Sequence, residues 1–256
     1  VIVTHLRCRA IPPAMSRYSP SRDPAAKRIF VLFSGDAMRA KNDPPVFQRW
    51  SWGPFFPGHC LFVSDPSLYL DPNMGLAWYS GTKDFDPLQV VARKLEVIGR
   101  QLGLPAAQFY FYGSSGGGFA AIRMLTFMPD SAAISINPQT RIAEYHSKAV
   151  ELYTEKCFGI RDRTKAEQKY PRRLSLIENA DILRNRRIIL IQNKIDKHHY
   201  EGHYKPFCAA LGVGNDHSPG STPIHRILFS HEGGHRKAES SEVFEEAMAM
   251  VTGGSL

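Results

Sequence analysis

The sequence has no long apolar run. Its longest apolar stretches, such as residues 188–191, have the length of a strand, whereas a transmembrane helix needs about 20 mostly apolar residues. We therefore expect no membrane-spanning segment. The 256 residues are 43% hydrophobic and 22% charged, a composition that excludes a disordered tail, a collagen-like fibre and a coiled coil. A chain of this length can bury a sizeable core as one α/β domain.

Cysteine is scarce and widely spaced. The chain has 4 cysteines and no C-x-x-C pair: Cys8, Cys60, Cys157 and Cys208. Disulfide frameworks are denser, and zinc sites need closer ligands, so we expect free thiols in the cytoplasm. The N-terminus lacks both a signal-peptide pattern and an initiator Met, so a leader could have been removed.

Acidic residues are in the minority. Against 32 Lys and Arg stand 24 Asp and Glu, which gives a formal charge of +8. The basic residues gather between positions 161 and 187 but alternate with acidic ones. A solvated basic face explains this pattern, and a surface for anionic ligands or membrane headgroups is the alternative. We expect no nucleic-acid partner, and the oligomeric state stays open.

Strand-length apolar runs alternate with helical patterns. We predict strands at residues 1–6, 28–33, 60–63, 108–112, 132–136, 188–191 and 225–229, and helices at 86–103, 119–127 and 239–251. Residues 10–24 are rich in Pro, Ser and Arg and predict a loop. Residues 139–187 are helical and polar, and are too long for a simple crossover. The alternation predicts a mostly parallel sheet with helices on both faces, in one domain over residues 1–256, with 139–187 as a helical excursion or partial lid.

One turn has the pattern G-x-S-x-G. Residues 113–117 read Gly-Ser-Ser-Gly-Gly, directly after an apolar strand and before an apolar helix. This is the setting of a nucleophile elbow, in which Ser115 projects its hydroxyl from a strained turn. A phosphate-binding loop is the alternative, but no Lys-Ser/Thr pair follows and the dinucleotide spacing does not fit. Ser115, and not Ser114, is the expected nucleophile because it occupies the central position of the motif.

The N–H of Gly116 begins the following helix, where unpaired donors and the helix dipole favour an oxyanion. A second donor is expected from the loop after the strand at residues 28–33. That loop reads Ser34-Gly35-Asp36, and either the Gly35 or the Asp36 N–H could serve.

A serine nucleophile needs a base and an acid that orients it. Asp196 follows the strand at 188–191, and His235 follows the strand at 225–229. Parallel strands bring their carboxyl ends to one edge, so these two side chains are predicted to meet Ser115. His231 is a rival for the base, and Asp216 and Glu144 are rivals for the acid.

Two further features allow more than one interpretation. His199 and His203 have the spacing of metal ligands on a helix, but H-E-x-x-H is absent and Gly202 weakens a helix, so no metal is expected. A polar wall beside Asp196 or surface histidines are the alternatives. Trp78 and Tyr79, like residues 50–52, could stack against sugars or belong to the core.

The elbow around Ser115, followed by Asp196 and His235, with Gly35 in the oxyanion loop, resembles an α/β-hydrolase over residues 28–251. Segments 112–121, 137–139 and 192–199 resemble bacterial hydrolase-like proteins of polysaccharide or glycan modification, including accessory-secretion acetyltransferases. The resemblance implies a three-layer α/β-hydrolase fold and no cofactor. It adds candidate substrate-binding residues: Asn137, Gln139 and His199. No His-Gly pair opens the oxyanion loop, which separates the chain from common lipases.

These residues predict acyl transfer through an acyl-enzyme, in which a Ser-His-Asp triad hydrolyses a carboxylic ester. The substrate is a small ester or an acylated carbohydrate. Transfer of the acyl group to a glycan hydroxyl uses the same residues and stays open, as does a non-catalytic binding module. In the excursion, four apolar side chains could shape an acyl pocket: Tyr145, Val150, Tyr153 and Phe158.

Overall fold

A central sheet organises the computed structural model, which describes residues 15–23, 25–216, 223–237 and 239–253. The strand predicted at residues 1–6 lies outside these ranges. In the described part, the sheet has seven strands in the order β1-β3-β2-β4-β5-β6-β7. Every neighbouring pair is parallel except β1 with β3, so the predicted mostly parallel sheet is confirmed. The strands are β1 (Ser16–Ser19), β2 (Ile29–Phe33), β3 (His59–Val63), β4 (Phe109–Ser114), β5 (Ala132–Ile136), β6 (Arg187–Asn193) and β7 (Ile224–Phe229).

The predicted loop at residues 10–24 is wrong where β1 lies. Ser16–Ser19 pairs antiparallel with β3 at the edge of the sheet, Tyr18 opposite Leu61. Its residues are half-buried or exposed, and they carry no apolar alternation. Backbone pairing therefore forms this strand, and side-chain patterning could not reveal it.

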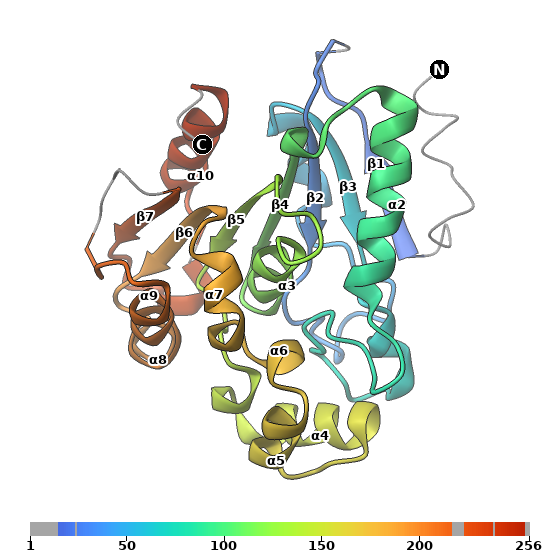
Figure 1. The fold of residues 1–256 in the computed structure, drawn as a ribbon, viewed down its shortest axis with the longest axis vertical. Coiled ribbons are helices and arrows are strands. Elements are labelled where there is room, and N and C mark those ends of the chain that lie inside the picture. The colour runs from blue at the N-terminus through green and yellow to red at the C-terminus, as the bar shows by residue number, and fades with distance from the viewer. Residues whose placement is uncertain (1–14, 24, 217–222, 238, 254–256) are drawn as a thin grey trace.

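Both faces of the sheet are covered. In β2, Ile29, Val31 and Phe33 pack with the core on the side of α2 and α3. Phe30 and Leu32 pack on the opposite side, with residues of α10. Such two-sided burial explains the continuous apolar runs in the sequence. Figure 1 shows α2 and α10 at the two flanks of the sheet.

The helices end at sequence signals. Asp86 caps α2 by accepting from the Leu88 N–H at 3.2 Å, and Gly103 ends it at φ 65°. The predicted helix at 119–127 begins earlier, at Gly116. The helices are α2 (Pro87–Leu102), α3 (Gly116–Met124), α4 (Ser147–Phe158), α5 (Arg163–Lys169), α6 (Pro171–Leu174), α7 (Ala180–Leu183), α8 (Lys197–His199), α9 (Lys205–Leu211) and α10 (Ser241–Thr252). Among them, none is long and apolar enough to cross a bilayer.

The segment between β5 and β6 is helical, as predicted. In Figure 1, α4, α5 and α6 lie beyond the end of the sheet to which β2 and β3 point. Arg173 fixes α6 by donating to the carbonyl oxygens of Ser80, Thr82 and Phe85. The excursion is therefore tied to the loop that precedes α2.

The predicted acyl-pocket role is wrong for three of its four residues. Val150, Tyr153 and Phe158 are at most 4% exposed and belong to the core. The Tyr153 hydroxyl donates to the Gly81 carbonyl oxygen at 3.0 Å. Their helical spacing reflects packing of α4 on the body of the protein. Tyr145 alone of the four reaches a cavity described below.

Candidate active site

Ser115 occupies the junction between β4 and α3. Its backbone has φ 56° and ψ −124°, a conformation that is strained for any residue with a Cβ. Its N–H donates to the Ile136 carbonyl oxygen at 2.9 Å, which ties the turn to β5. The serine is only 6% exposed. The sequence pattern thus corresponds to a real strand–turn–helix with a strained serine at its tip.

Two glycines allow this turn to close. A Cβ on Gly113 would lie 2.4 Å from the carbonyl carbon and oxygen of Gly117, and a Cβ on Gly117 would lie 2.4 Å from the Phe33 carbonyl oxygen. Both contacts involve backbone, which has little freedom to move away. The helix α3 can therefore approach β4 and β2 only because these positions lack side chains.

The Ser115 hydroxyl meets an amide. Gln139 Nε2 donates to Ser115 Oγ at 2.6 Å and lies 2.8 Å from His199 Nε2. Gln139 Oε1 accepts from Trp78 Nε1 at 3.1 Å. Among the described residues, Ser115 Oγ has no direct hydrogen bond to an imidazole. Such bonds are often loose without substrate.

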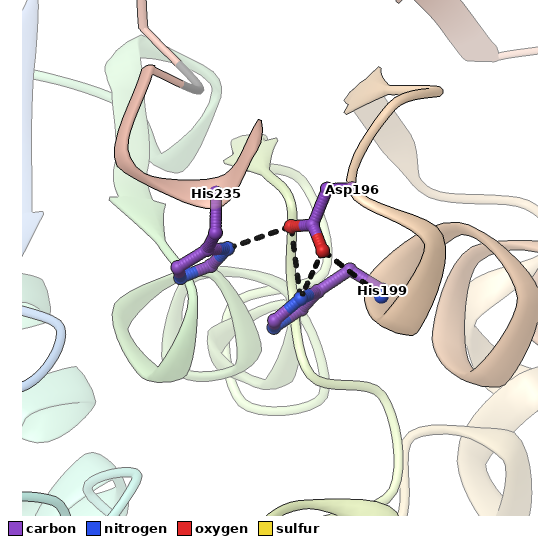
Figure 2. Close-up of side chains that lie close together, drawn as sticks. All are labelled: Asp196, His199 and His235. Atoms are coloured by element: carbon purple, nitrogen blue, oxygen red, sulfur yellow. Dashed lines mark hydrogen bonds and ion pairs between the residues drawn. The ribbon is translucent and has the colours of Figure 1, made fainter. Parts of the chain in front are cut away.

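One carboxylate holds two imidazoles, as Figure 2 shows. Asp196 Oδ2 accepts from His235 Nδ1 at 2.8 Å. Asp196 Oδ1 accepts from His199 Nδ1 at 3.1 Å, and the same nitrogen lies 2.9 Å from Oδ2. Oδ2 also accepts from Asn137 Nδ2 at 3.0 Å, and Oδ1 caps α8 by accepting from the His199 N–H. The structure therefore brings together Asp196 and His235, as the strand ends predicted, and adds His199 as a second imidazole.

The electrostatics of this cluster favour an ionised Asp196 and a neutral His199. Burial acts to raise the pKa of Asp196, but hydrogen bonds from His199 and His235 outweigh it and hold that pKa well below the usual range. Burial also lowers the pKa of His199, although Asp196 opposes this. The His199 and His235 rings stack with centroids 4.1 Å apart, so two adjacent cations would repel each other.

The rival residues lie outside this cluster. His231 Nδ1 accepts from the Gly233 N–H at 3.0 Å, and so stabilises its own turn. Glu144 forms a salt bridge with Arg141 at 3.3 Å. Asp216 is exposed. Within the described ranges, none of these three residues forms a hydrogen bond with Ser115, His199 or His235.

Asn193 holds the loop that carries His235, a role that sequence reasoning missed. Its Nδ2 donates to the carbonyl oxygens of His231 at 2.8 Å and Gly234 at 3.0 Å. Its own N–H donates to Asn137 Oδ1 at 2.8 Å. One buried amide thus connects the ends of β5, β6 and β7. The only signal in the sequence was its place at the end of a strand.

The oxyanion loop adjoins the nucleophile. A Cβ on Gly35 would lie 3.5 Å from Ser115 Cβ. The Gly35 N–H donates to Gln48 Oε1 at 2.8 Å, and Gln48 Nε2 donates to the Asp36 carbonyl oxygen at 2.7 Å. The Gly35 donor is therefore already occupied. Within the described part of the chain, the Asp36 N–H has no acceptor, and that of Gly116 lies in the first turn of α3.

The predicted sugar-stacking surface is wrong for Trp78 and Tyr79. They are 0% and 2% exposed, so neither ring can stack against a substrate. Tyr79 instead accepts from the Ser34 N–H and donates to the Val63 carbonyl oxygen. The alternative interpretation, core aromatics, holds for this pair. Trp50, by contrast, is 51% exposed.

The histidines also bear on metal binding. His203 Nδ1 accepts from the Thr140 N–H at 3.2 Å, so it is engaged with backbone instead of pairing with His199 around an ion. Asp196, His199 and His235 each offer one ligand atom, all within 4.8 Å of one another. These atoms already bond to each other, so a metal ion would have to replace two imidazole protons.

A cavity of about 310 Å³ opens beside the oxyanion loop. Asp36 and Leu76 line it at the end near the elbow, and a Cβ on Gly116 would meet Leu76 Cδ1. Tyr145 lines it from the excursion, and its ring lies 6.1 Å from that of His199. The remaining lining residues are Met38, Arg39, Ala40, Asn73, Met74, Gly75, Ala149 and Leu152.

No protein-family model and no curated protein matches the sequence. Solved structures do match its fold. A chain of the Gap123 glycosylation-associated complex from Streptococcus agalactiae superposes with TM-score 0.65 and 15% identity, over 92% of this chain but only 43% of that one. The capsule O-acetyltransferase of Neisseria meningitidis serogroup A superposes with TM-score 0.59 and 15% identity, over 94% and 90% of the two chains.

An S-formylglutathione hydrolase from Agrobacterium tumefaciens is similar to the same extent, with TM-score 0.58 and 15% identity over 94% and 88% of the two chains. Identities at this level establish the fold alone. The chain has the three-layer α/β-hydrolase fold that its sequence predicted.

Proposed function

We propose that the protein is a serine-dependent acyl-transfer enzyme, most simply a carboxylic ester hydrolase. The observation that carries the proposal is the backbone of Ser115, held at φ 56° and ψ −124° between β4 and α3. Strain of this kind, on a serine at a strand–helix turn, is typical of a nucleophile. The pair of Asp196 and His235, at 2.8 Å, supports it.

In this reaction, Ser115 Oγ attacks the ester carbonyl carbon while its proton passes to His235 Nε2. The carbonyl oxygen becomes an oxyanion, which the N–H groups of Gly116 and Asp36 stabilise. We assign the second donor to Asp36 because Gln48 occupies that of Gly35. The alcohol then leaves with the proton from His235, and an acyl-enzyme remains. Water attacks this ester with His235 again as the base, which regenerates Ser115.

We propose the cavity beside the oxyanion loop as the substrate pocket. Its volume of about 310 Å³ is at the lower end for small-molecule sites. Leu76 and Tyr145 offer apolar surface, and Asp36 and Asn73 offer groups that bind hydroxyls. Such a lining fits a short acyl group on a single sugar unit better than a long acyl chain.

Acyl transfer to a glycan hydroxyl is the second candidate. A sugar hydroxyl replaces water in the last step, with the same residues in the same roles. The similarity in fold to a capsule O-acetyltransferase is the observation that favours it. A non-catalytic binding module is the third candidate, and the strained Ser115 with its Asp196–His235 pair speaks against it.

A fluorophosphonate probe tests the proposal. We expect it to label the folded wild-type protein and Ser114→Ala, but not Ser115→Ala, since Ser114 Oγ bonds to Arg49 and is not the attacking atom. Absence of labelling on folded wild type would refute an active serine. Acetylated sugars and short nitrophenyl esters, with and without a sugar acceptor, then distinguish hydrolysis from transfer.

A further inference from the structure

The orientation of the Gln139 side chain is dictated by its neighbour. The indole N–H of Trp78 can only donate, and it lies 3.1 Å from Gln139 Oε1. Both residues are 0% exposed, so no water can substitute for this contact. The amide oxygen must therefore face Trp78, and the amide nitrogen must face Ser115 and His199.

Both N–H groups of Gln139 are then committed. One donates to Ser115 Oγ at 2.6 Å, and the other meets His199 Nε2 at 2.8 Å. His199 Nε2 must accept this bond, so His199 is neutral and carries its proton on Nδ1. That proton faces Asp196 at 2.9 Å. The lone pair of His199 that could take a proton from Ser115 is already occupied.

His235 differs in this respect. Its Nδ1 donates to Oδ2 of the same carboxylate, Asp196, at 2.8 Å, which leaves Nε2 as an acceptor. Because Ser115 Oγ accepts from Gln139, the serine's own proton is free to point elsewhere. Two imidazoles thus share one carboxylate, and only one of them is free to act as a base.

We propose that Gln139, oriented by Trp78, is a positioning residue that makes His235 the base by occupying His199. This inference rests on the function proposed above. Gln139 exchanges no proton: the Ser115 proton passes to His235 Nε2, while the two amide N–H bonds stay intact. Its bond to Oγ also supports the negative charge that Oγ gains when the acyl group is released.

The surroundings of His199 keep it neutral while His235 becomes charged. His199 is 3% exposed, and an imidazolium there would stack on the imidazolium of His235 at 4.1 Å. Burial lowers the pKa of His199, and Asp196 only partly compensates. The titratable groups facing it are Asp196, His198, His203, His235 and Tyr145.

The ring tautomer of His199 tests the contact without any activity assay. Nitrogen-15 NMR of the histidine rings in the wild-type protein at pH 7, assigned by comparison with His199→Gln, should show His199 protonated on Nδ1 alone. A proton on Nε2, or on both nitrogens, would overturn the inference. This result is independent of whether the protein hydrolyses esters.

Variants of Gln139 test the consequence. We expect Gln139→Ala to lower kcat for ester hydrolysis about tenfold to a hundredfold, the effect of one or two lost hydrogen bonds, with KM nearly unchanged. Gln139→Glu cannot donate, so it should convert His199 to the doubly protonated form and also lower kcat. Gln101→Ala, exposed on α2, should match wild type. Wild-type kcat together with a wild-type His199 tautomer in folded Gln139→Ala would refute the role.

The choice of base is tested separately. His235→Ala should lose fluorophosphonate labelling although His199 is intact. Labelling that persists in His235→Ala but disappears in His199→Ala would make His199 the base and overturn the inference. If the folded wild-type protein is not labelled at all, the proposed function fails, while the His199 tautomer still decides whether Gln139 acts on that ring.

Discussion

His203 should make the stability of this protein fall as the pH is lowered below neutral. Its side chain is 0% exposed, and burial, followed by the nearby His199 and His198, lowers its pKa to about 3. Its Nδ1 accepts from the Thr140 N–H at 3.2 Å, a bond that only the neutral ring can make. In the unfolded chain the same imidazole titrates near its ordinary pKa of about 6.5.

The sign follows from proton binding. Below about pH 6.5 the unfolded chain binds a proton at His203, whereas the folded chain does not bind this proton until about pH 3. Stability from this residue is therefore complete above pH 6.5 and is lost as the pH falls. At about 1.4 kcal/mol per pH unit, the loss is about 2 kcal/mol at pH 5 and about 5 kcal/mol near pH 3.

Urea unfolding followed by circular dichroism at pH 7.5 and pH 5.0 measures this contribution. In His203→Asn, the side-chain oxygen can still accept from the Thr140 N–H, but nothing titrates. We expect the variant to be less stable at pH 7.5, because packing is lost, and the difference from wild type to shrink by about 2 kcal/mol at pH 5.0. The contributions of Asp196 and His199 to the pH dependence of stability are present in both proteins and therefore cancel in the difference.

A stability difference between wild type and His203→Asn that stays constant between the two pH values would refute the reasoning.

Protonation of His203 should also affect function. Thr140 directly follows Gln139, and its hydroxyl also donates to the His203 carbonyl oxygen at 3.0 Å. Protonation of His203 should therefore loosen the segment that places Gln139 beside Ser115, and labelling of Ser115 should weaken with stability.

Two other substitutions test packing around the site. Gly117→Ala places a Cβ 2.4 Å from the Phe33 carbonyl oxygen, so it should abolish labelling or folding. Gly202→Ala meets nothing within 4 Å and should raise the free energy of unfolding by the helix preference of Ala, about 1 kcal/mol. Glu239→Gln leaves the Arg49 side chain, which is 11% exposed, without the carboxylate that lies 2.7 Å from it. This change should lower the free energy of unfolding by about 3 kcal/mol. In a double-mutant cycle with Arg49→Met, the double variant should lose much less than the two single losses added together.

Strands and helices were predictable because burial on both faces leaves continuous apolar runs, and because Asp86 and Gly103 are strong end signals. β1 was not, since an edge strand can form from backbone pairing alone. The elbow was also readable, because its pattern is local: Gly113 is required by a backbone contact with Gly117, four residues later. The contact that requires Gly117, with the Phe33 carbonyl oxygen, is distant in sequence. The burial of Trp78 could not be read, because it depends on a bond to Gln139, 61 positions away.

The same limit applies to the two imidazoles. Strand ends predicted that Asp196 and His235 would meet, and the resemblance suggested His199 only as a substrate-binding residue. The sequence spacing of Asp196 and His199 allows a bond within one turn of α8, but it does not say that Gln139 occupies the other ring nitrogen. That fact depends on the loops after β3, β5 and β6 meeting at one edge.

The many donors on Asp196 have a consequence for the reaction. His235 and the Asn137 amide donate to its Oδ2, and His199 donates to its Oδ1. The hydrogen bonds from the two histidines hold the pKa of this carboxyl well below its usual range despite burial. We therefore expect Asp196 to stay ionised in mildly acidic solution. We then expect loss of activity on mild acidification to come from protonation of a histidine and not of Asp196. A second histidine on one carboxylate thus lowers the pKa of that carboxyl further. In the proposed mechanism, Gln139 keeps this second histidine from competing with His235 as the base.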